Sequence, residues 1–485
     1  MVRLASVSLA SVVLVFASLC PAQAVGWRGD GSGHYPQAQP PTQWGPDKNI
    51  VWKCPLPKTS NAMPVIVGDR IFVCGEPTDL ICVSKADGKI LWARGNNYDL
   101  VMTEADKAQA AKDGAESARI RKEELGPVEK QQRESEKRLQ EVTPAKPKWA
   151  GTNPATRPAP TPPTATQQAE IDQLKPRIAE LKKQIDAIKK KLTGLAKWAI
   201  PPTEGSNGHS SATPVSDGKV VAAVFNNGLA VCYDLEGKLQ WSRLIDKPTH
   251  DWGSSSSPLI HQDKMLVHFV NMVALDLATG KELWKAPATD WHWGSPILAR
   301  VGEIDVAITA AGDVIRLADG KVMVKKLIAL EYSSPVFKDG VAYFIANPGR
   351  GVKLTAKGAD EIMAEPLWTT RPKNDRYYGS PVLLDGLIYA VNQVKVFSVI
   401  DAATGKVEVE KDLALGKQTM YSSIVRAGPY IYVSNEDGNT LVLEPGKEMK
   451  EVARNELGDR FRSTPVFEAA RMYIRAQKAL YCIGQ

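Results

Sequence analysis

Residues 254–284 decide the fold; they read SSSSPLIHQDKMLVHFVNMVALDLATGKELW. Small residues before Pro258 begin a first strand, and a polar turn at Asp263 reverses the chain into a second strand of alternating apolar residues. A third strand ends at Thr279-Gly280, where glycine supplies the positive φ of a tight turn. A fourth strand carries Trp284, which can fill the space between neighbouring sheets. The stretch therefore predicts one small sheet of four short strands.

The start of this unit recurs eight times along the chain. From Pro214 onward the starts are 44, 38, 39, 46, 43 and 41 residues apart. A period of about 40 to 50 residues with four strands per copy is typical of propeller blades. The eight starts are Met63-Pro64-Val65, Thr213-Pro214-Val215, Ser257-Pro258-Leu259, Ser295-Pro296-Ile297, Ser334-Pro335-Val336, Ser380-Pro381-Val382, Ser423-Ile424-Val425 and Thr464-Pro465-Val466.

The turn and the tryptophan of the unit recur as well. The Gly-Lys turn before the fourth strand is repeated at Gly88, Gly237, Gly280, Gly320, Gly405 and Gly446. Tryptophan follows at Trp92, Trp241, Trp284 and Trp368, whereas the fourth, sixth and seventh copies carry aliphatic residues there.

The eighth copy ends before its fourth strand. The chain stops soon after Cys482, and the stretch Ile50-Val51-Trp52 near the other end resembles the missing strand. Pairing the two would remove two exposed sheet edges, which otherwise invite aggregation. The sequence thus predicts an all-β fold, an eight-bladed β-propeller closed by an N-terminal strand.

These motifs resemble the pyrroloquinoline-quinone-type (PQQ-like) propeller repeat. That superfamily includes the quinoprotein alcohol dehydrogenases and the BamB-like outer-membrane-protein assembly lipoproteins. The start Gly26-Trp27-Arg28-Gly29-Asp30-Gly31, with Trp44 and Val51-Trp52-Lys53 after it, resembles a subgroup of exported bacterial propellers of unassigned role. The resemblance implies the fold, but the repeat is shared by proteins of different function.

The N-terminus reads as a secretory signal peptide. Arg3 is the charged start, residues 5–19 form a short apolar core, and Ala22-Gln23-Ala24 is a small-x-small cleavage site. We expect cleavage after Ala24, with lipid attachment at Cys20 as the alternative, and a periplasmic or secreted protein. No later stretch is long and apolar enough to span a membrane.

Five cysteines would remain after cleavage, an odd number that excludes a fully paired disulfide framework. Cys82, Cys232 and Cys482 occupy the small-residue position of the third strand, so we expect them to be buried and inert. A bridge between Cys74 and Cys82 is the alternative, because export permits disulfides.

A helical insertion follows the first blade, since Pro64 and Pro214 are 150 residues apart. Residues 104–142 are rich in Ala, Glu, Lys, Arg and Gln, with a break expected near Gly126-Pro127, and residues 143–166 are rich in Pro, Thr and Ala. A heptad seam follows, and Pro176 inside it should either kink the helix or mark a late start. The seam predicts a coiled-coil hairpin with a Pro-rich tip. The seam consists of Ile171, Leu174, Ile178, Leu181, Ile185, Ile188, Leu192 and Leu195.

The seam could bury its apolar residues in three ways. We expect it to pack on the first helix of the same chain, with self-association or another protein as alternatives. The predicted organisation is a signal peptide at 1–24, a surface segment at 25–48, the closing strand and first blade at 49–103, the coiled-coil insertion at 104–197 and the remaining blades at 198–485.

Residues that enter the first strands should ring the mouth of the central channel. The second residue of each start is a proline, except for Ile424 in the seventh copy. Three positions before this residue stand Asn61, Ser211, Ser255, Trp293, Tyr332, Tyr378, Tyr421 and Arg462. Nearby loops add His209, His250, Asp251, Trp252, Asp290, Trp291, His292, Glu331, Asp375, Arg376 and Arg460. An aromatic mouth with a few charged groups is a candidate site for sugars, quinones or peptide side chains. In the alternative, the rings only pack between blades and plug the channel.

The favoured hypothesis is a non-catalytic binding or scaffold module for a protein partner or polysaccharide of the cell envelope. The resemblance leaves an alternative, a PQQ- or metal-dependent oxidoreductase with Asp251, Asp290 or Asp375 as a base. The chain lacks the Cys-Cys pair of those enzymes, a repeated-Asp calcium loop and the Gly-x-Ser-x-Gly and His-Glu-x-x-His motifs. We therefore expect no cofactor and no metal. The net charge of +7 comes largely from the Lys-rich second helix and is interpreted as a solvated helix face, with attraction to acidic lipids, polysaccharide or an acidic partner as the alternative. An exported protein is not expected to bind nucleic acid.

Overall fold

The computed structural model describes residues 24–144, 162–286 and 292–484. The chain divides into two compact units. The smaller is Asn97–Pro201, and the larger is formed by the chain on either side of it.

The described part of the larger unit forms eight sheets, each made of consecutive antiparallel strands. The first four are β3 (Val65–Val67), β4 (Arg70–Gly75), β5 (Asp79–Ser84) and β6 (Ile90–Gly95); β7 (Val215–Ser216), β8 (Val220–Val224), β9 (Leu229–Asp234) and β10 (Leu239–Leu244); β11 (Leu259–His261), β12 (Lys264–His268), β13 (Met272–Asp276) and β14 (Glu282–Lys285); and β15 (Ile297–Val301), β16 (Ile304–Ile308), β17 (Val314–Arg316) and β18 (Val322–Val324).

The later sheets follow the same order, and two of them take a strand from the N-terminal segment. They are β19 (Val336–Lys338), β20 (Val341–Phe344), β21 (Gly349–Lys357) and β22 (Glu361–Thr370); β23 (Val382–Leu384), β24 (Leu387–Val391), β25 (Val396–Asp401) and β26 (Val407–Asp412); β27 (Val425–Ala427), β28 (Tyr430–Ser434), β29 (Asn439–Leu443) and β30 (Glu451–Glu456) with β1 (His34–Tyr35); and β31 (Val466–Glu468), β32 (Arg471–Arg475) and β33 (Ala479–Ile483) with β2 (Ile50–Pro55).

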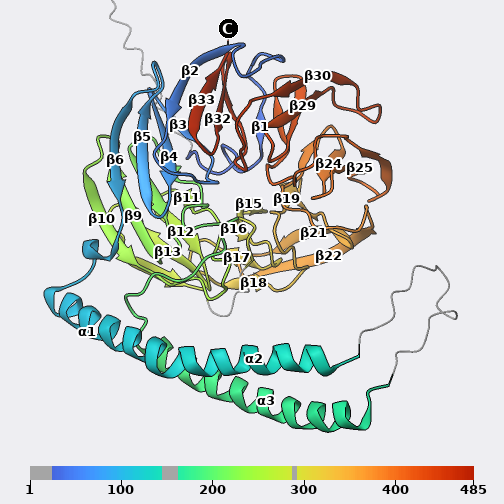
Figure 1. The fold of residues 1–485 in the computed structure, drawn as a ribbon. Helices are drawn as coiled ribbons and strands as arrows, with labels where there is room; N and C mark the ends of the chain where they lie inside the picture. The colour runs from blue at the N-terminus through green and yellow to red at the C-terminus, as the bar shows by residue number, and fades with distance from the viewer. Residues whose placement is uncertain (1–23, 145–161, 287–291, 485) are drawn as a thin grey trace, which may run out of the picture. The chain divides into compact units, whose positions relative to one another are not determined.

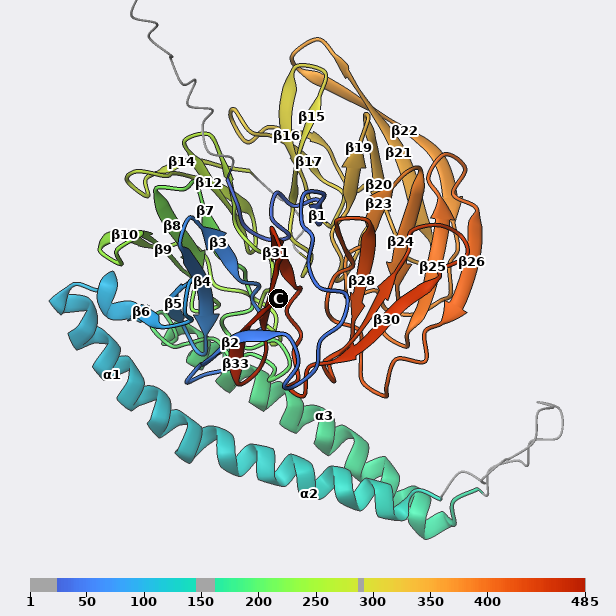
Figure 2. The same cartoon turned by 90° about the horizontal axis from the view of Figure 1, so that it is seen from above.

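The sheets stand side by side around a common centre (Figures 1 and 2). Strands β3, β7, β11, β15 and β19, each the first of its sheet, neighbour one another in that order. The first strand of each unit therefore lies innermost, so the residues that lead into it converge. At the far end of the chain β2 pairs with β33, placing Trp52 opposite Cys482.

Tryptophans of the fourth strands join neighbouring sheets. The indole nitrogen of Trp241 donates to the Leu277 carbonyl oxygen of the next sheet at 2.8 Å. A methyl group on Gly280 would lie 2.6 Å from this indole, so only glycine lets the turn and the ring approach so closely. The same pair of contacts, which we call the Trp–Gly lock, is made by Trp52 with Gly88, Trp92 with Gly237, Trp284 with Gly320 and Trp368 with Gly405.

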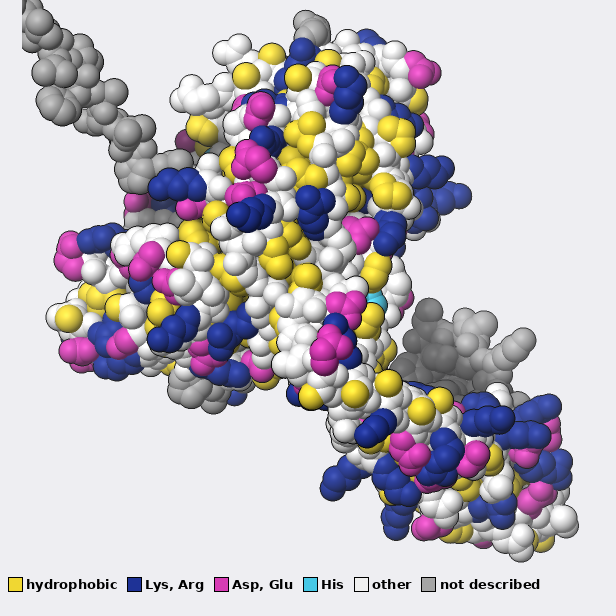
Figure 3. Space-filling model, turned by 90° about the vertical axis from the view of Figure 1, so that its left-hand side faces the viewer, with side chains coloured by type: hydrophobic (Ala, Val, Ile, Leu, Met, Phe, Trp, Pro, Cys, Tyr) yellow, Lys and Arg dark blue, Asp and Glu magenta, His cyan; other side chains and the backbone are white. Residues whose placement is uncertain are grey.

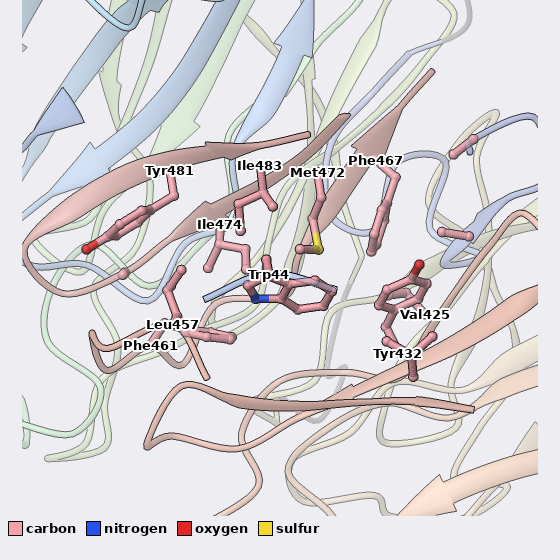
Figure 4. Packing of buried hydrophobic residues seen from close by; sticks show 14 of the residues in the cluster. Trp44, Val425, Tyr432, Leu457, Phe461, Phe467, Met472, Ile474, Tyr481 and Ile483 are labelled. Atoms are coloured by element: carbon pink, nitrogen blue, oxygen red, sulfur yellow. The ribbon is translucent and has the colours of Figure 1, made fainter. Parts of the chain in front are cut away.

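The N-terminal segment enters the larger unit, so the prediction of a surface segment over residues 25–48 is wrong for part of it. Arg28 is fully buried. Trp44 is also buried, and Figure 4 shows it among Met472 and Ile474 of β32. The Gly- and Pro-rich composition suggests an exposed segment, but burying apolar side chains such as Trp44 stabilises its packing against the sheets.

The cysteines of the described chain are all buried and unbridged, as expected for Cys82, Cys232 and Cys482. The alternative of a Cys74–Cys82 bridge is therefore wrong. These two residues lie on the paired strands β4 and β5 but are not opposite each other, because Cys74 faces Leu80 and Cys82 faces Phe72.

The smaller unit is a helical hairpin. It contains a 3-10 turn (Tyr98–Leu100), α1 (Glu104–Ile120), a π turn (Arg121–Leu125), α2 (Gly126–Val142) and α3 (Ala165–Gly194). The break expected near Gly126-Pro127 is not a break, because the π turn carries α1 directly into α2 and Pro127 falls in the first turn of α2, where it is tolerated. Pro176 does not end α3 either; its side chain faces outward.

The apolar seam of α3 packs within the chain, as predicted. Ile185, Ile188 and Leu192 form one buried cluster with Ile120 and Leu125. Ion pairs flank this seam: Lys191 with Glu124 at 3.0 Å, and Arg138 with Glu170 at 2.6 Å. Lys, Arg, Asp and Glu are mixed over the exposed surface of the helices (Figure 3). A search of the described residues finds no helix long and apolar enough to cross a membrane.

Candidate functional site

One cavity of about 190 Å³ lies at the ends where the first strands begin. All eight residues that the sequence places at the channel mouth line it: Asn61, Ser211, Ser255, Trp293, Tyr332, Tyr378, Tyr421 and Arg462. They converge because each stands four positions before the first strand of its sheet. We call this space the mouth cavity.

Aromatic rings form one wall of the mouth cavity. Trp293 stacks on Tyr332 with ring centroids 5.4 Å apart, Tyr332 meets Tyr378 edge-on at 4.7 Å, and Tyr378 stacks on Tyr421 at 4.9 Å. The rings do pack on one another, as the alternative of a purely structural plug expects. They nevertheless stay only half-buried, and Trp252 continues the row with 37% of its surface exposed.

The opposite wall is polar, and its one charged lining residue among the described ones is Arg462. The Arg462 guanidinium binds Glu436 at 2.7 Å, and Arg460 binds the same carboxylate oxygen at 2.9 Å. The guanidinium of Arg462 also lies 4.9 Å from the Tyr421 ring centre. One buried carboxylate is therefore shared by two guanidinium groups, and the Arg462 guanidinium already has a partner.

The loop of residues 204–209 completes the polar wall. Asn61 Nδ2 donates to the carbonyl oxygens of Ser206 and Asn207 at 2.8 and 3.1 Å, and Arg462 Nη1 donates to the Ser206 oxygen at 2.5 Å. Asn207 Nδ2 in turn donates to the Trp252 carbonyl oxygen at 2.6 Å. Ser206 and Asn207 line the cavity but were not predicted, because they belong to no repeat.

A belt of hydroxyl groups lies below these residues. In most sheets the first residue of the repeat start donates its backbone N–H to the side-chain hydroxyl oxygen of the corresponding residue in the next sheet. Examples are Ser257 N to Ser295 Oγ at 2.9 Å and Ser380 N to Ser423 Oγ at 3.0 Å. The further links are Met63 to Thr213, Thr213 to Ser257, Ser334 to Ser380 and Ser423 to Thr464.

Ser334 breaks the regularity of this hydroxyl belt. Its side chain lines the mouth cavity and is only 1% exposed, yet its Oγ has no hydrogen-bond partner. A buried hydroxyl without a partner costs about 1–3 kcal/mol. Such a group marks a position where a bound molecule could satisfy it.

The floor of the mouth cavity comes from the N-terminal segment. Trp27 lines the cavity, with the Arg28 guanidinium 5.2 Å from its ring centre. Arg28 Nη2 donates to the carbonyl oxygens of Pro381 and Ile424 at 2.9 and 2.8 Å, which ties the segment to two sheets. Burial lowers the pKa of Arg28 to about 10, so the side chain stays charged at neutral pH. Nothing in the repeat pattern predicts this floor, because the segment lies outside the repeats.

The other loop residues placed near the mouth mostly lie outside it. Among the described ones only Trp252 lines the cavity. His250 touches the Trp293 ring from the side at 5.0 Å, and Arg376 Nη1 donates to the Tyr378 hydroxyl oxygen at 3.3 Å. Those that do not line it are His209, His250, Asp251, His292, Glu331, Asp375, Arg376 and Arg460. Asp290 and Trp291 fall outside the described residues.

The chemistry of the cavity lining does not fit a metal-bound acidic quinone. Such a group needs several cationic partners and a cluster of carboxylates for its metal. The described lining offers one cation, Arg462, which Glu436 already binds. In the described parts of the chain no three His, Cys, Asp or Glu side chains gather as metal ligands would. The described lining therefore lacks the partners that such a quinone requires.

Comparison with known proteins agrees with this fold. A family model described as outer membrane protein assembly factor BamB matches residues 190–324. The chain resembles the solved europium-containing methanol dehydrogenase with a TM-score of 0.51 and 11% identity, over 90% of this chain and 87% of that one. BamB from Moraxella catarrhalis gives a TM-score of 0.43 and 15% identity, over 56% and 80%. No curated protein matches the sequence.

A third solved structure, the quinohemoprotein alcohol dehydrogenase ADHIIG from Pseudomonas putida HK5, gives a TM-score of 0.48 and 10% identity, over 93% of this chain and 74% of that one. The sheets and the matched repeats define a β-propeller with an inserted helical hairpin. The repeats at residues 190–324 match the BamB family model, and the chain shares its fold with the methanol dehydrogenase, in agreement with the PQQ-like propeller repeat that the motifs suggested. At these identities the likeness shows the fold and leaves the function open.

Proposed function

We propose that this protein is a non-catalytic binding module of the cell envelope, with the mouth cavity as its docking site. One observation carries the proposal: eight residues at equivalent repeat positions line one cavity, yet they belong to five different residue types. Residues kept only for the fold would repeat, as the Trp–Gly locks do. The partner is a protein or a surface polymer, and the family model that matches residues 190–324 describes an assembly factor.

The finer architecture supports this role. We propose that the eight sheets are eight blades, closed into a ring by β2, and that the ring is one domain with residues 104–197 as a separate docking element. Residues 1–24 act as a signal peptide, which places the mature protein in the periplasm or outside the cell. The ring holds the mouth residues rigidly, and rigid residues lose less entropy on binding.

An oxidoreductase is the second candidate, and the fold likeness to methanol dehydrogenase favours it. The cavity lining does not, since it offers neither the cations nor the carboxylates that a quinone and its metal require. Titrating pyrroloquinoline quinone into calcium-loaded protein, with Trp fluorescence as readout, separates the two candidates. Saturable quenching that weakens in Trp293→Ala would show that the quinone binds at the mouth cavity and would favour an oxidoreductase.

The main test is binding of the purified protein to washed cell envelopes of the source bacterium. We expect Trp293→Ala and Tyr378→Ala to weaken binding about tenfold or more, because aromatic contacts dominate such sites. Ile90→Ala is the matched control, since Ile90 is an exposed apolar residue on the outer strand β6. Equal binding of all three variants and the wild type would refute the role of the mouth cavity.

A further inference from the structure

We propose that the mouth cavity binds a neutral, hydroxyl-rich sugar unit of a glycan. This inference rests on the proposed function and names the ligand class of the same site. Three features of the described lining support it: an arginine that is already bound to a buried carboxylate, an exposed indole beside stacked rings, and a buried hydroxyl without a partner.

The charge pattern argues against ionic ligands. Arg462 is bound by Glu436, whose side chain is only 5% exposed and also binds Arg460. An acidic ligand would have to compete with this buried carboxylate for the guanidinium. A basic ligand would find no carboxylate in the described lining, because Glu436 does not line the cavity. A neutral ligand meets neither obstacle, since it needs no charge partner.

The aromatic wall suits a ring with apolar faces. Trp252 lies at the end of the row, with its ring centre 6.1 Å from that of Trp293 and 37% of its surface exposed. The tyrosines further along stack on one another, so they present ring edges and hydroxyl groups more than open faces. An indole surface beside phenol hydroxyls matches a sugar, which carries an apolar C–H face and polar hydroxyls at its edges.

The hydroxyl belt provides the hydrogen bonds. Ser334 Oγ is buried, lines the cavity and has no partner, whereas its neighbour Ser380 Oγ accepts from the Ser334 backbone N–H at 2.9 Å. The Tyr378 hydroxyl oxygen already accepts from Arg376, so its own proton is available to a ligand oxygen. A sugar hydroxyl can donate and accept at once, which is what these two groups require together.

The test is calorimetric titration of the full-length mature protein with cello-, manno-, xylo- and chito-oligosaccharides. Oligogalacturonate serves as the acidic comparison and oligolysine as the basic one. We expect saturable binding of at least one neutral oligosaccharide. Its affinity should be the same at 0.1 and 0.5 M salt, because salt screens charges over distances on the order of 3–10 Å and this complex contains no ion pair. Trp252→Ala should weaken it about tenfold or more, by analogy with aromatic hot spots, and Ser334→Ala about three- to tenfold, by loss of one hydrogen bond. Ile90→Ala should not change it.

The outcomes separate this inference from the proposed function. Binding of the acidic or the basic oligomer alone, with strong salt dependence, would overturn the neutral-sugar inference, and so would failure of every neutral oligosaccharide to bind. If envelope binding still falls in Trp293→Ala in either case, the proposed function stands with a different ligand. If envelope binding is also unchanged, both ideas fail.

Discussion

The junctions between the sheets and the mouth cavity follow opposite rules. At the junctions the same contacts recur: an indole nitrogen bonds a carbonyl of the next sheet, and its ring covers a turn glycine. At the mouth the equivalent position holds an amide, two serines, four aromatic residues and an arginine. The recurring contacts join neighbouring sheets, whereas the mouth positions vary in residue type, as the proposed binding role requires.

The largest expected effect comes from breaking a junction. Trp241 is 8% exposed and locks two sheets, so Trp241→Ala should lower the free energy of unfolding by about 3–5 kcal/mol. The mouth variant Trp252→Ala, which removes an exposed indole, should lower it by less than about 1 kcal/mol. Urea denaturation followed by circular dichroism measures both. Similar losses for the two variants would erase the distinction between junction and mouth.

His268 is a buried residue that makes the stability of the sheets depend on pH. His268, at the end of β12, is fully buried, and burial, with a smaller contribution from the nearby His292, lowers its pKa to about 4. Because the unfolded chain binds this proton more tightly, stability is lost as pH falls from about 6.5 toward 4. Between pH 7 and pH 5 the loss should be about 2 kcal/mol. His268→Leu should flatten this part of the stability–pH profile measured by urea denaturation; an unchanged profile would show that other groups cause it.

The glycine of a lock allows a matched pair of substitutions. Gly280 has a φ of +69°, and a methyl group there would lie 2.6 Å from Trp241; Gly358 has nearly the same φ, +68°, with nothing within 4 Å. Both alanine variants bear the cost of left-handed backbone, about 1 kcal/mol. Gly280→Ala should lose about 1–2 kcal/mol more, from overpacking. Thermal unfolding of both variants tests this, and equal losses would mean that the indole simply moves aside.

The smallest effect distinguishes two serines of the hydroxyl belt. Ser380→Ala removes the acceptor of the Ser334 N–H and should cost about 1 kcal/mol or more. Ser334→Ala removes a buried hydroxyl without a partner and should therefore raise the free energy of unfolding by about 1 kcal/mol. Ser334→Ala should nevertheless weaken ligand binding, which separates a mouth role from a junction role within one belt. A large loss of stability in Ser334→Ala would show that the hydroxyl has a structural partner.

Most of what could be predicted from the sequence depends on the repeat. The sheets, the junction tryptophans and the convergence of Trp293 and Tyr378 follow from positions counted along similar units. What the sequence could not provide arises between residues far apart that share no pattern, such as Arg28 with Ile424. Local composition also misled: the Gly-Pro pair at 126–127 suggests a break, but packing on α3 keeps the helix continuous through a π turn.

The N-terminal segment has a consequence for the order of folding. Strand β2 pairs with β33 and β1 pairs with β27, so the first strands to leave the ribosome find their partners among the last. Contacts of such long sequence separation form late. Trp27 and Arg28 reach their positions only when the carbonyls of Pro381 and Ile424 exist to hold them. An unfinished chain therefore lacks the floor of the mouth cavity. Under the proposed function, the protein can bind its partner only after the whole polypeptide has been made.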